Sequence, residues 1–136
     1  MRTKPHQVLA GLPPWMTALI EHHDAIRPEA RTLLEQAKVR LAEIEAKPPA
    51  DSAAVAVAVL HPFHLTVKAL LAAHAMKSFS TLASLELLRL LYGTELPEDL
   101  LQLYVGVQRV TIQGAKSIEA AKSFIDHAAQ LIAKTS

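Results

Sequence analysis

The chain ends in a stretch, residues 97–134, that decides its fold and reads PEDLLQLYVGVQRVTIQGAKSIEAAKSFIDHAAQLIAK. Small or apolar residues recur in it at every seventh position, at Val107, Gly114, Ala121 and Ala128. A row of mostly apolar residues runs along each side of this ladder, and no step is skipped. Such a period is typical of an α-helix with a broad apolar face. We therefore predict one long helix over residues 97–134.

The composition limits the classes of protein that need to be considered. The 136 residues are enough for one domain, and 51% are hydrophobic although only 4% are aromatic, which favours a helix-rich fold. The net charge of +1 provides no basic field for nucleic acid. The lack of cysteine excludes disulfides, thiol nucleophiles and cysteine-ligated metals, and it fits a cytoplasmic location.

The N-terminal part of the chain is predicted to begin irregularly. Residues 1–14 contain Pro5, Gly11, Pro13 and Pro14, which break any regular element there. The prolines also interrupt the apolar core that a signal peptide would need. A first helix is predicted over residues 15–26, where apolar residues share one face.

A second helix is predicted from Pro28, because proline suits the first helical position and Glu29 follows it. Its buried face is expected to carry apolar residues at steps of four and three: Ala30, Leu34, Ala37, Leu41 and Ile44. Asp51 or Ser52 can cap the helix after it.

Residues 53–60 alternate valine with alanine, which is a strand period, although alanine favours helix. We predict helix, because no second strand candidate is found to pair with it. Pro62 predicts a break or a sharp kink after His61. The following residues, 62–92, form two helices or one bent helix that ends at Gly93. The uncharged run over residues 52–67 is shorter than the roughly 20 residues of a membrane span, so no transmembrane segment is predicted.

These elements predict an all-α fold: an antiparallel bundle of four to five helices with one long C-terminal helix, in a single domain over residues 15–136. A straight helix over residues 97–134 would be about 57 Å long, more than its neighbours can cover. Either it breaks near Gly114 or part of it projects. Its wide apolar face packs against two neighbours within the chain or meets another chain. The candidate interface residues are Val107, Gly114, Ile118, Ala121, Ile125, Ala128 and Ile132.

The seven histidines raise the question of a metal site. Glu21 and Asp24 are three residues apart, as are His61 and His64, and helical metal sites need ligands three or four apart on one face. No predicted helix carries a histidine four residues before a second histidine or a glutamate. We therefore predict no metal ligands and no cofactor, and we keep a metal-binding helical bundle as the last alternative, with these four residues as its candidates.

A second candidate site is the segment His74-Ala75-Met76-Lys77-Ser78. It resembles the phosphorylation motif of histidine phosphotransfer domains, which are also helical bundles. The resemblance implies that His74 accepts a phosphoryl group, Lys77 holds it and Ser78 leaves room for a docking receiver domain. The sequence departs from that pattern, because Ser78 stands where glycine is usual and bulky Phe79 follows it. The alternative is a half-buried histidine that continues an apolar stripe.

The third candidate relationship covers residues 83–133, which have an Ala/Leu-rich helix, a short break, an acidic helix start at Pro97-Glu98-Asp99 and a long helix with Gln, Ala and Lys. This arrangement resembles the C-terminal half of phasins, the proteins that coat polyhydroxyalkanoate granules in bacteria. The resemblance implies a non-catalytic role in which amphipathic helices cover an apolar surface and self-associate.

No nucleophile motif, glycine-rich phosphate loop or isolated carboxylate pair is found in the sequence. We therefore expect a non-enzymatic helical interaction protein that forms homo-oligomers and coats a hydrophobic surface or binds a protein partner. A phosphotransfer module that uses His74 is the first alternative.

Overall fold

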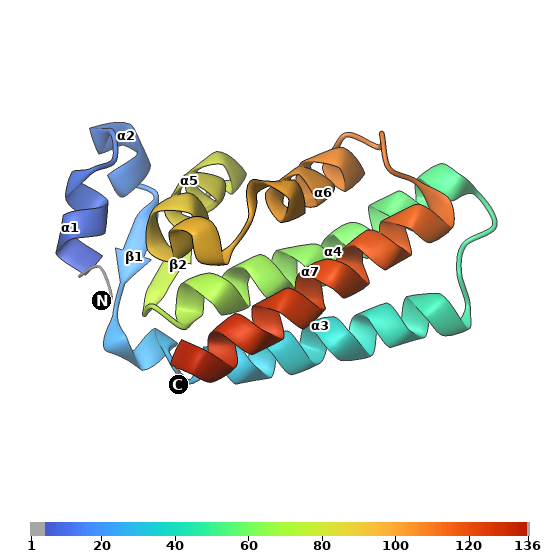
Figure 1. Cartoon of the computed structure of the whole chain (residues 1–136), viewed down its shortest axis with the longest axis horizontal. Helices are drawn as coiled ribbons and strands as arrows, with labels where there is room; N and C mark the ends of the chain where they lie inside the picture. Colours follow the sequence, from blue (N-terminus) through green and yellow to red (C-terminus); the bar gives the residue numbers. More distant parts are fainter. Residues whose placement is uncertain (1–4, 136) are drawn as a thin grey trace.

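The structure is a computed structural model that describes residues 5–135, with side chains from residue 8 onward. It is an all-α bundle built around three long helices that run side by side, α3 (Glu29–Ala46), α4 (Ser52–Ala72) and α7 (Gly114–Thr135) (Figure 1). The helix α4 lies at the centre, because it packs against α3, α7, α6 and α5. The predicted fold class is confirmed.

Two shorter helices, α5 (Thr81–Tyr92) and α6 (Glu98–Gln108), cover the side of α4 that α3 leaves open (Figure 1). The remaining elements are short, and most of them lie at the end of the bundle where the chain begins. They are α1 (Pro5–Ala10), α2 (Pro14–Thr17), β1 (Ile20–His22), η1 (Asp24–Ile26), β2 (Met76–Ser78) and η2 (Gly93–Glu95).

Several local predictions are confirmed. The five residues predicted to form the inner face of α3 are all buried. The stretch of alternating valine and alanine is helical, and Asp51 caps it by accepting a hydrogen bond from Ala54 N at 3.1 Å. Gly93 ends α5 with a φ of 55°, a left-handed conformation that glycine adopts without strain.

The predicted break at Pro62 is wrong, because α4 continues through it. Proline inside a helix costs about 3 kcal/mol, since it removes one hydrogen bond and crowds the preceding turn. Here Pro62 is buried, and next to it Phe63 is fully buried and stacks on Tyr104 with ring centroids 5.4 Å apart. The packing of α4 therefore outweighs the preference of His61, the residue before proline, for an extended backbone. Thr66 Oγ1 also donates to the carbonyl oxygen of Pro62 at 2.7 Å.

The N-terminal predictions are wrong in two places. Residues 5–10 of the predicted irregular arm form α1, and most of the predicted helix over residues 15–26 is replaced by α2, β1 and η1. The strand β1 pairs antiparallel with β2, and Phe79 N donates to the carbonyl oxygen of Leu19 at 2.9 Å. The partner strand lies more than fifty positions away in the sequence, so the local pattern could not reveal the pairing.

The predicted single helix over residues 97–134 is also wrong, because the chain turns between α6 and α7. The carbonyl oxygen of Gly106 accepts hydrogen bonds from Thr111 N at 2.9 Å and Ile112 N at 3.1 Å, which closes α6. A Cβ atom on Gly106 would lie 2.6 Å from Ile112 Cδ1, so glycine permits this close turn. Val110 and Gly114 then adopt positive φ values of 59° and 58°. Of the two predicted alternatives, a break near Gly114 or a projecting helix, the structure shows the break. The last helix, α7, is therefore about as long as its neighbour α4.

Among the described residues, α4 is the one helix long and apolar enough to cross a membrane, with a mean hydropathy of 1.6 over its best window. Inside the bundle 61% of that window is buried. A core helix of this kind meets the same criteria, so the observation is weak evidence for a span.

Candidate functional site

The apolar face predicted as an interface lies mostly inside the chain's own core. Val107, Ala121 and Ala128 have no exposed surface, and Ile125 and Ile132 are each 3% exposed. Of the remaining two candidates, Gly114 and Ile118 are partly exposed. Val107 lies on α6, and the other four buried residues lie on α7, which packs against α4, α3 and α6. Of the two alternatives for this face, packing within the chain therefore describes these five residues.

The predicted phosphotransfer residues do not share a helix face. His74 lies in the turn after α4, partly exposed, with its ring edge-on to Tyr92 at a centroid distance of 4.9 Å. Lys77 and Ser78 lie on β2, where Lys77 is exposed and Ser78 Oγ donates to the carbonyl oxygen of Ser80 at 3.0 Å. The helical spacing on which the resemblance depends is absent, so this geometry does not favour phosphotransfer.

The four candidate metal ligands lie on three different elements. Glu21 is on β1, and Asp24 begins η1, where it forms an exposed ion pair with Arg27 at 3.6 Å. His61 and His64 are both on α4, with His61 exposed and His64 partly buried. Within residues 5–135, no group of three or more His, Cys, Asp or Glu side chains is arranged to hold a metal ion.

His64 is held in an apolar environment. Its Nε2 atom is buried without a hydrogen-bond partner among the described residues, and its ring lies edge-on to Tyr104 at 5.5 Å. Burial lowers the pKa of His64 below its ordinary value, and the nearby charges of Lys68 and His61 lower it further. The imidazole is therefore neutral at pH 7.

A pocket of about 320 Å³ lies beside His64, between α4, α6 and the connection from β2 to α5. Burial raises the pKa of Tyr104, which lines it, to about 12, so the phenol stays protonated. Ser80 Oγ caps α5 by accepting from Ala83 N at 3.4 Å, and Ser84 Oγ donates to the carbonyl oxygen of Ser80 at 2.8 Å. These hydroxyl groups stabilise the turn, and none of these contacts pairs a nucleophile with a general base.

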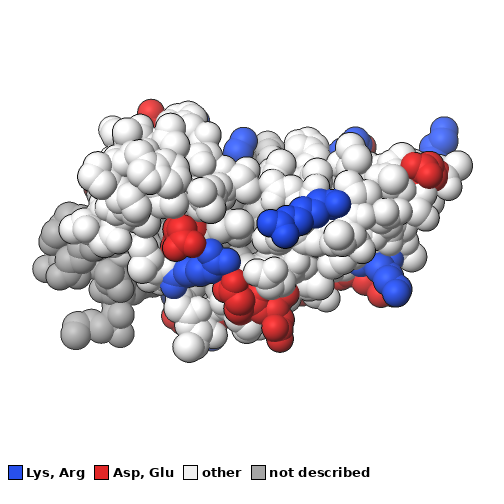
Figure 2. Space-filling view, turned by 90° about the horizontal axis from the view of Figure 1, so that it is seen from above, with Lys and Arg blue, Asp and Glu red and all other residues white. Residues whose placement is uncertain are grey.

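The large apolar side chains that remain exposed fall into two regions. The first, which we call the α5-end patch, consists of Trp15, Phe79, Leu82 and Leu90, whose exposed fractions are 52%, 61%, 53% and 43%. Leu82 and Leu90 lie on the outer side of α5, and Phe79 precedes that helix by two residues. The pairing of Phe79 N with Leu19 O holds the chain that follows α2 beside the start of α5. Charge also lies beside the two leucines, because Arg89 pairs with Glu86 on the outer side of α5 at 2.6 Å, and acidic and basic side chains are visible among the uncharged ones at this end (Figure 2).

The α5-end patch was missed from the sequence, although a signal for it was present. The predicted inward stripe of α5 contains Leu85, Leu88 and Tyr92, and all three are buried. The same helical period places Leu82 and Leu90 on the opposite, outward side. Leucines on the solvent side of a helix are the pattern that could have identified this region.

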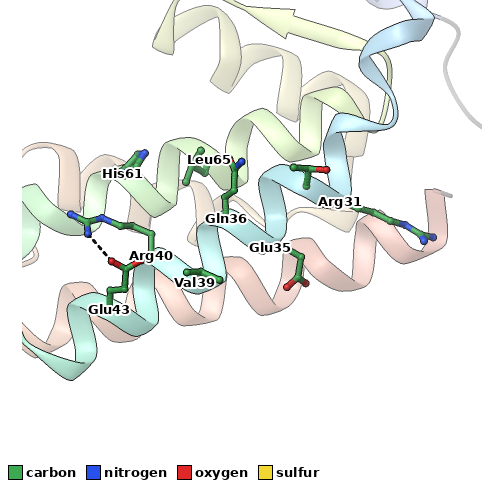
Figure 3. Close-up of a pocket in the computed structure, with 9 residues that line it drawn as sticks. Arg31, Glu35, Gln36, Val39, Arg40, Glu43, His61 and Leu65 are labelled. Atoms are coloured by element: carbon green, nitrogen blue, oxygen red, sulfur yellow. Dashed lines mark hydrogen bonds and ion pairs between the residues drawn. The ribbon is translucent and has the colours of Figure 1, made fainter.

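The second region is a groove of about 660 Å³ between the outer sides of α3 and α4, with Val39 at its centre (Figure 3). Val39 is 57% exposed, and Val57, on the same side of α4 as His61 and Leu65, is 60% exposed. Charged side chains of both signs line α3 along this groove, and Arg40 pairs with Glu43 at 3.4 Å (Figure 3). The groove therefore combines an apolar floor with alternating charge.

Comparison with protein-family models, with curated protein sequences and with solved structures gives no match. The two exposed apolar regions are therefore the features of the described residues that bear most directly on function.

Proposed function

We propose that the protein is a non-catalytic helical interaction protein that binds a neutral apolar surface through the α5-end patch. The observation that carries this proposal is the exposure of two aromatic and two leucine side chains on α2, on α5 and on the residues that lead into α5, outside a well-packed core. Exposed apolar groups that gather in one region mark interaction sites, whereas scattered single ones need no explanation.

The energetics support an apolar partner. Full burial of one large apolar side chain is worth about 1.5–3 kcal/mol, so covering the exposed parts of four such side chains favours binding by several kcal/mol. Lys77 lies over the ring of Phe79 at 5.8 Å, and Arg89, next to Leu90, pairs with Glu86 at 2.6 Å and with Glu98 at 2.7 Å. Because two carboxylates balance the charge of Arg89, a neutral surface, such as stored lipid or polyester, fits this chemistry better than a strongly anionic one.

The proposal agrees with the role that the phasin resemblance implies, although it uses a different surface. Amphipathic helices were expected to cover an apolar surface with the face of the C-terminal helix, and that face is buried. The α5-end patch supplies an exposed apolar area without opening the bundle. The phasin-like interpretation itself remains a proposal.

Flotation with triolein droplets coated with phosphatidylcholine tests the proposal. The wild-type protein is expected to rise with the droplets, and the double variant Phe79→Asp, Leu82→Asp is expected to remain in the aqueous layer. The single variant Phe79→Asp has the matched control Val57→Asp, because Val57 is 60% exposed and Phe79 61%, and each variant adds one carboxylate, in the patch or outside it. Circular dichroism checks that all these proteins are folded. Wild-type protein that stays in solution, or a double variant that floats equally well, would contradict the proposal.

The same assay with polyhydroxybutyrate particles examines the phasin-like interpretation. Binding to the polyester that is lost in the same double variant would support a granule-coating role. Binding to triolein without binding to polyester would keep the apolar-surface function and remove the phasin-like interpretation.

A further inference from the structure

The pocket of about 320 Å³ beside His64 combines apolar walls with a polar rim. Val67 of α4, Tyr104 of α6 and Phe79, which precedes α5, supply apolar surface. Lys68 and the hydroxyl groups at the start of α5 supply polar groups. Small-molecule sites commonly combine apolar walls with a few polar groups in this way, and they occupy about 300–1,000 Å³. The volume of this pocket is therefore suited to a ligand built on a single ring.

The charge of this pocket is not balanced within it. Lys68 is exposed, and none of the described residues that line the pocket is acidic. Within residues 5–135, Lys68 forms no ion pair with a carboxylate, whereas Lys122 pairs with Glu45 at 2.6 Å. Lys68 also lines a second pocket of about 120 Å³ together with Glu29 of α3 and Lys77 of β2, so the net charge around it is positive.

His64 adds a second group that an anion would favour. Its ring lines the same pocket one helical turn before Lys68, and burial and the charge of Lys68 hold the pKa of His64 below its ordinary value. A negative charge in the pocket would attract Lys68 and favour the protonated form of His64. Tyr104, whose pKa is raised to about 12, stays neutral. The groups of the pocket that carry or gain charge near neutral pH are thus both cationic.

We propose that this pocket binds a small aromatic carboxylate, with the carboxylate at Lys68 and the ring against Phe79 and Tyr104. The ring of Phe79 is more than half exposed, so a second ring can pack on it edge-to-face or offset. Ser80 Oγ accepts from Ala83 N, which leaves its own hydroxyl hydrogen to donate to the carboxylate. Nε2 of His64 is buried, so His64 senses the charge of the ligand without donating to it from that nitrogen.

An NMR titration with benzoate at pH 6 tests the inference, with benzamide as an uncharged molecule of nearly the same shape. Benzoate is expected to bind with a Kd on the order of 1 mM, and benzamide several-fold more weakly. Saturation with benzoate is expected to raise the pKa of His64, whose resonances are assigned from the spectrum of His64→Gln. The pKa of His127, which lies on α7 outside this pocket, is expected to stay unchanged.

Variants of the exposed Lys68 test the position of the carboxylate without disturbing the core. Lys68→Gln is expected to weaken benzoate binding about three- to fivefold, as for the loss of one exposed ion pair. Lys68→Arg keeps the charge and is expected to bind benzoate nearly as well as the wild type. Lys116→Gln is the matched control, because Lys116 is an exposed lysine on α7 outside the pocket. Circular dichroism checks that the variants are folded.

Four outcomes would overturn the inference. They are benzoate binding that does not saturate, benzamide binding equal to that of benzoate, an equal loss in Lys68→Gln and Lys116→Gln, and a pKa of His64 that benzoate leaves unchanged. No droplets are present in this titration, so its failure leaves the proposed surface binding untouched. Flotation of Lys68→Gln with droplets is expected to match the wild type, because all four residues of the α5-end patch are intact in this variant.

Discussion

The α5-end patch and the groove between α3 and α4 both expose large apolar side chains, but they differ in the size of those side chains. The α5-end patch exposes two aromatic rings and two leucines, whereas the groove exposes Val39 among charged residues of α3. Both regions have ion pairs beside them, Arg89 with Glu86 on α5 and Arg40 with Glu43 on α3. The hydrophobic effect is not directional and grows with the apolar area that is buried, so the region with the larger apolar side chains is better suited to bind an apolar surface.

The largest expected effect comes from the core that both regions share. Phe63 is fully buried between Tyr104 and Phe124, with ring centroids 5.4 Å and 5.2 Å away. Phe63→Ala is expected to lower the free energy of unfolding by about 3–5 kcal/mol, because it removes aromatic contacts and leaves a cavity. Urea denaturation followed by circular dichroism measures this. Loss of stability below 1 kcal/mol would mean that the three rings do not form the centre of the fold.

The next effect separates the two regions by function. The double variant Phe79→Asp, Leu82→Asp is expected to weaken droplet binding by about 2–4 kcal/mol, because two half-exposed apolar groups no longer gain from burial. Its stability is expected to stay close to that of the wild type, because both side chains are more than half exposed. Flotation and urea denaturation on the same samples measure the two properties. A parallel loss of stability would show that the patch also supports the fold.

A smaller effect is expected from acid. The folded state lowers the pKa of His64, so the unfolded chain binds its proton more readily. The contribution of neutral His64 to stability is therefore present above the ordinary histidine pKa of 6.5 and is lost as pH falls through the lowered value. Because His64 lies beside the connection that carries Phe79, the α5 end should weaken first.

Urea denaturation at several pH values between 5 and 7.5 measures this effect. The slope of unfolding free energy against pH is expected to be reduced in His64→Gln, because that variant lacks the imidazole whose pKa folding lowers. The carboxyl group of Glu98 does not interfere in this range, because Arg89 holds its pKa below an ordinary value of 4.5. An equal slope in wild type and His64→Gln would show that His64 is protonated without cost.

The smallest effect is that of salt. When the ionic strength is raised from about 0.05 M to 0.5 M, droplet binding is expected to be unchanged, or stronger in sulfate salts, which favour apolar burial. Flotation at each salt concentration measures this. Droplet binding that weakens several-fold as salt is added would indicate a charged contact in place of an apolar one.

The comparison also shows where prediction from the sequence succeeded. The inner stripe of α3, from Ala30 to Ile44, was predicted in full, because helical periodicity is a local property and this helix has one buried side. Val39 lies on the side of α3 opposite that stripe, so helical periodicity predicts that it points outward. Whether another helix covers it there depends on where α7 and α4 pack.

The failures have a common physical cause. The apolar ladder from Val107 to Ala128 is continuous in sequence, yet the chain turns within it because Ile112 folds back over Gly106. Buried residues on two successive helices give the same pattern as buried residues on one. The strands β1 and β2 are short, and each depends on the other for its hydrogen bonds. A local pattern cannot contain a contact that forms only when distant segments meet.

The sequence by itself determined the helical class, the inner stripe of α3, the end of α5 at Gly93, the cap at Asp51 and the lack of cysteine chemistry, because these depend on neighbouring residues alone. Only the tertiary structure decided that the C-terminal apolar face is core, that His64 is buried without a partner and that the exposed apolar side chains gather in two regions. The physical reason is that burial is a property of the packed chain. A residue is buried or exposed according to which helices cover it, and this depends on how all the helices of the bundle pack.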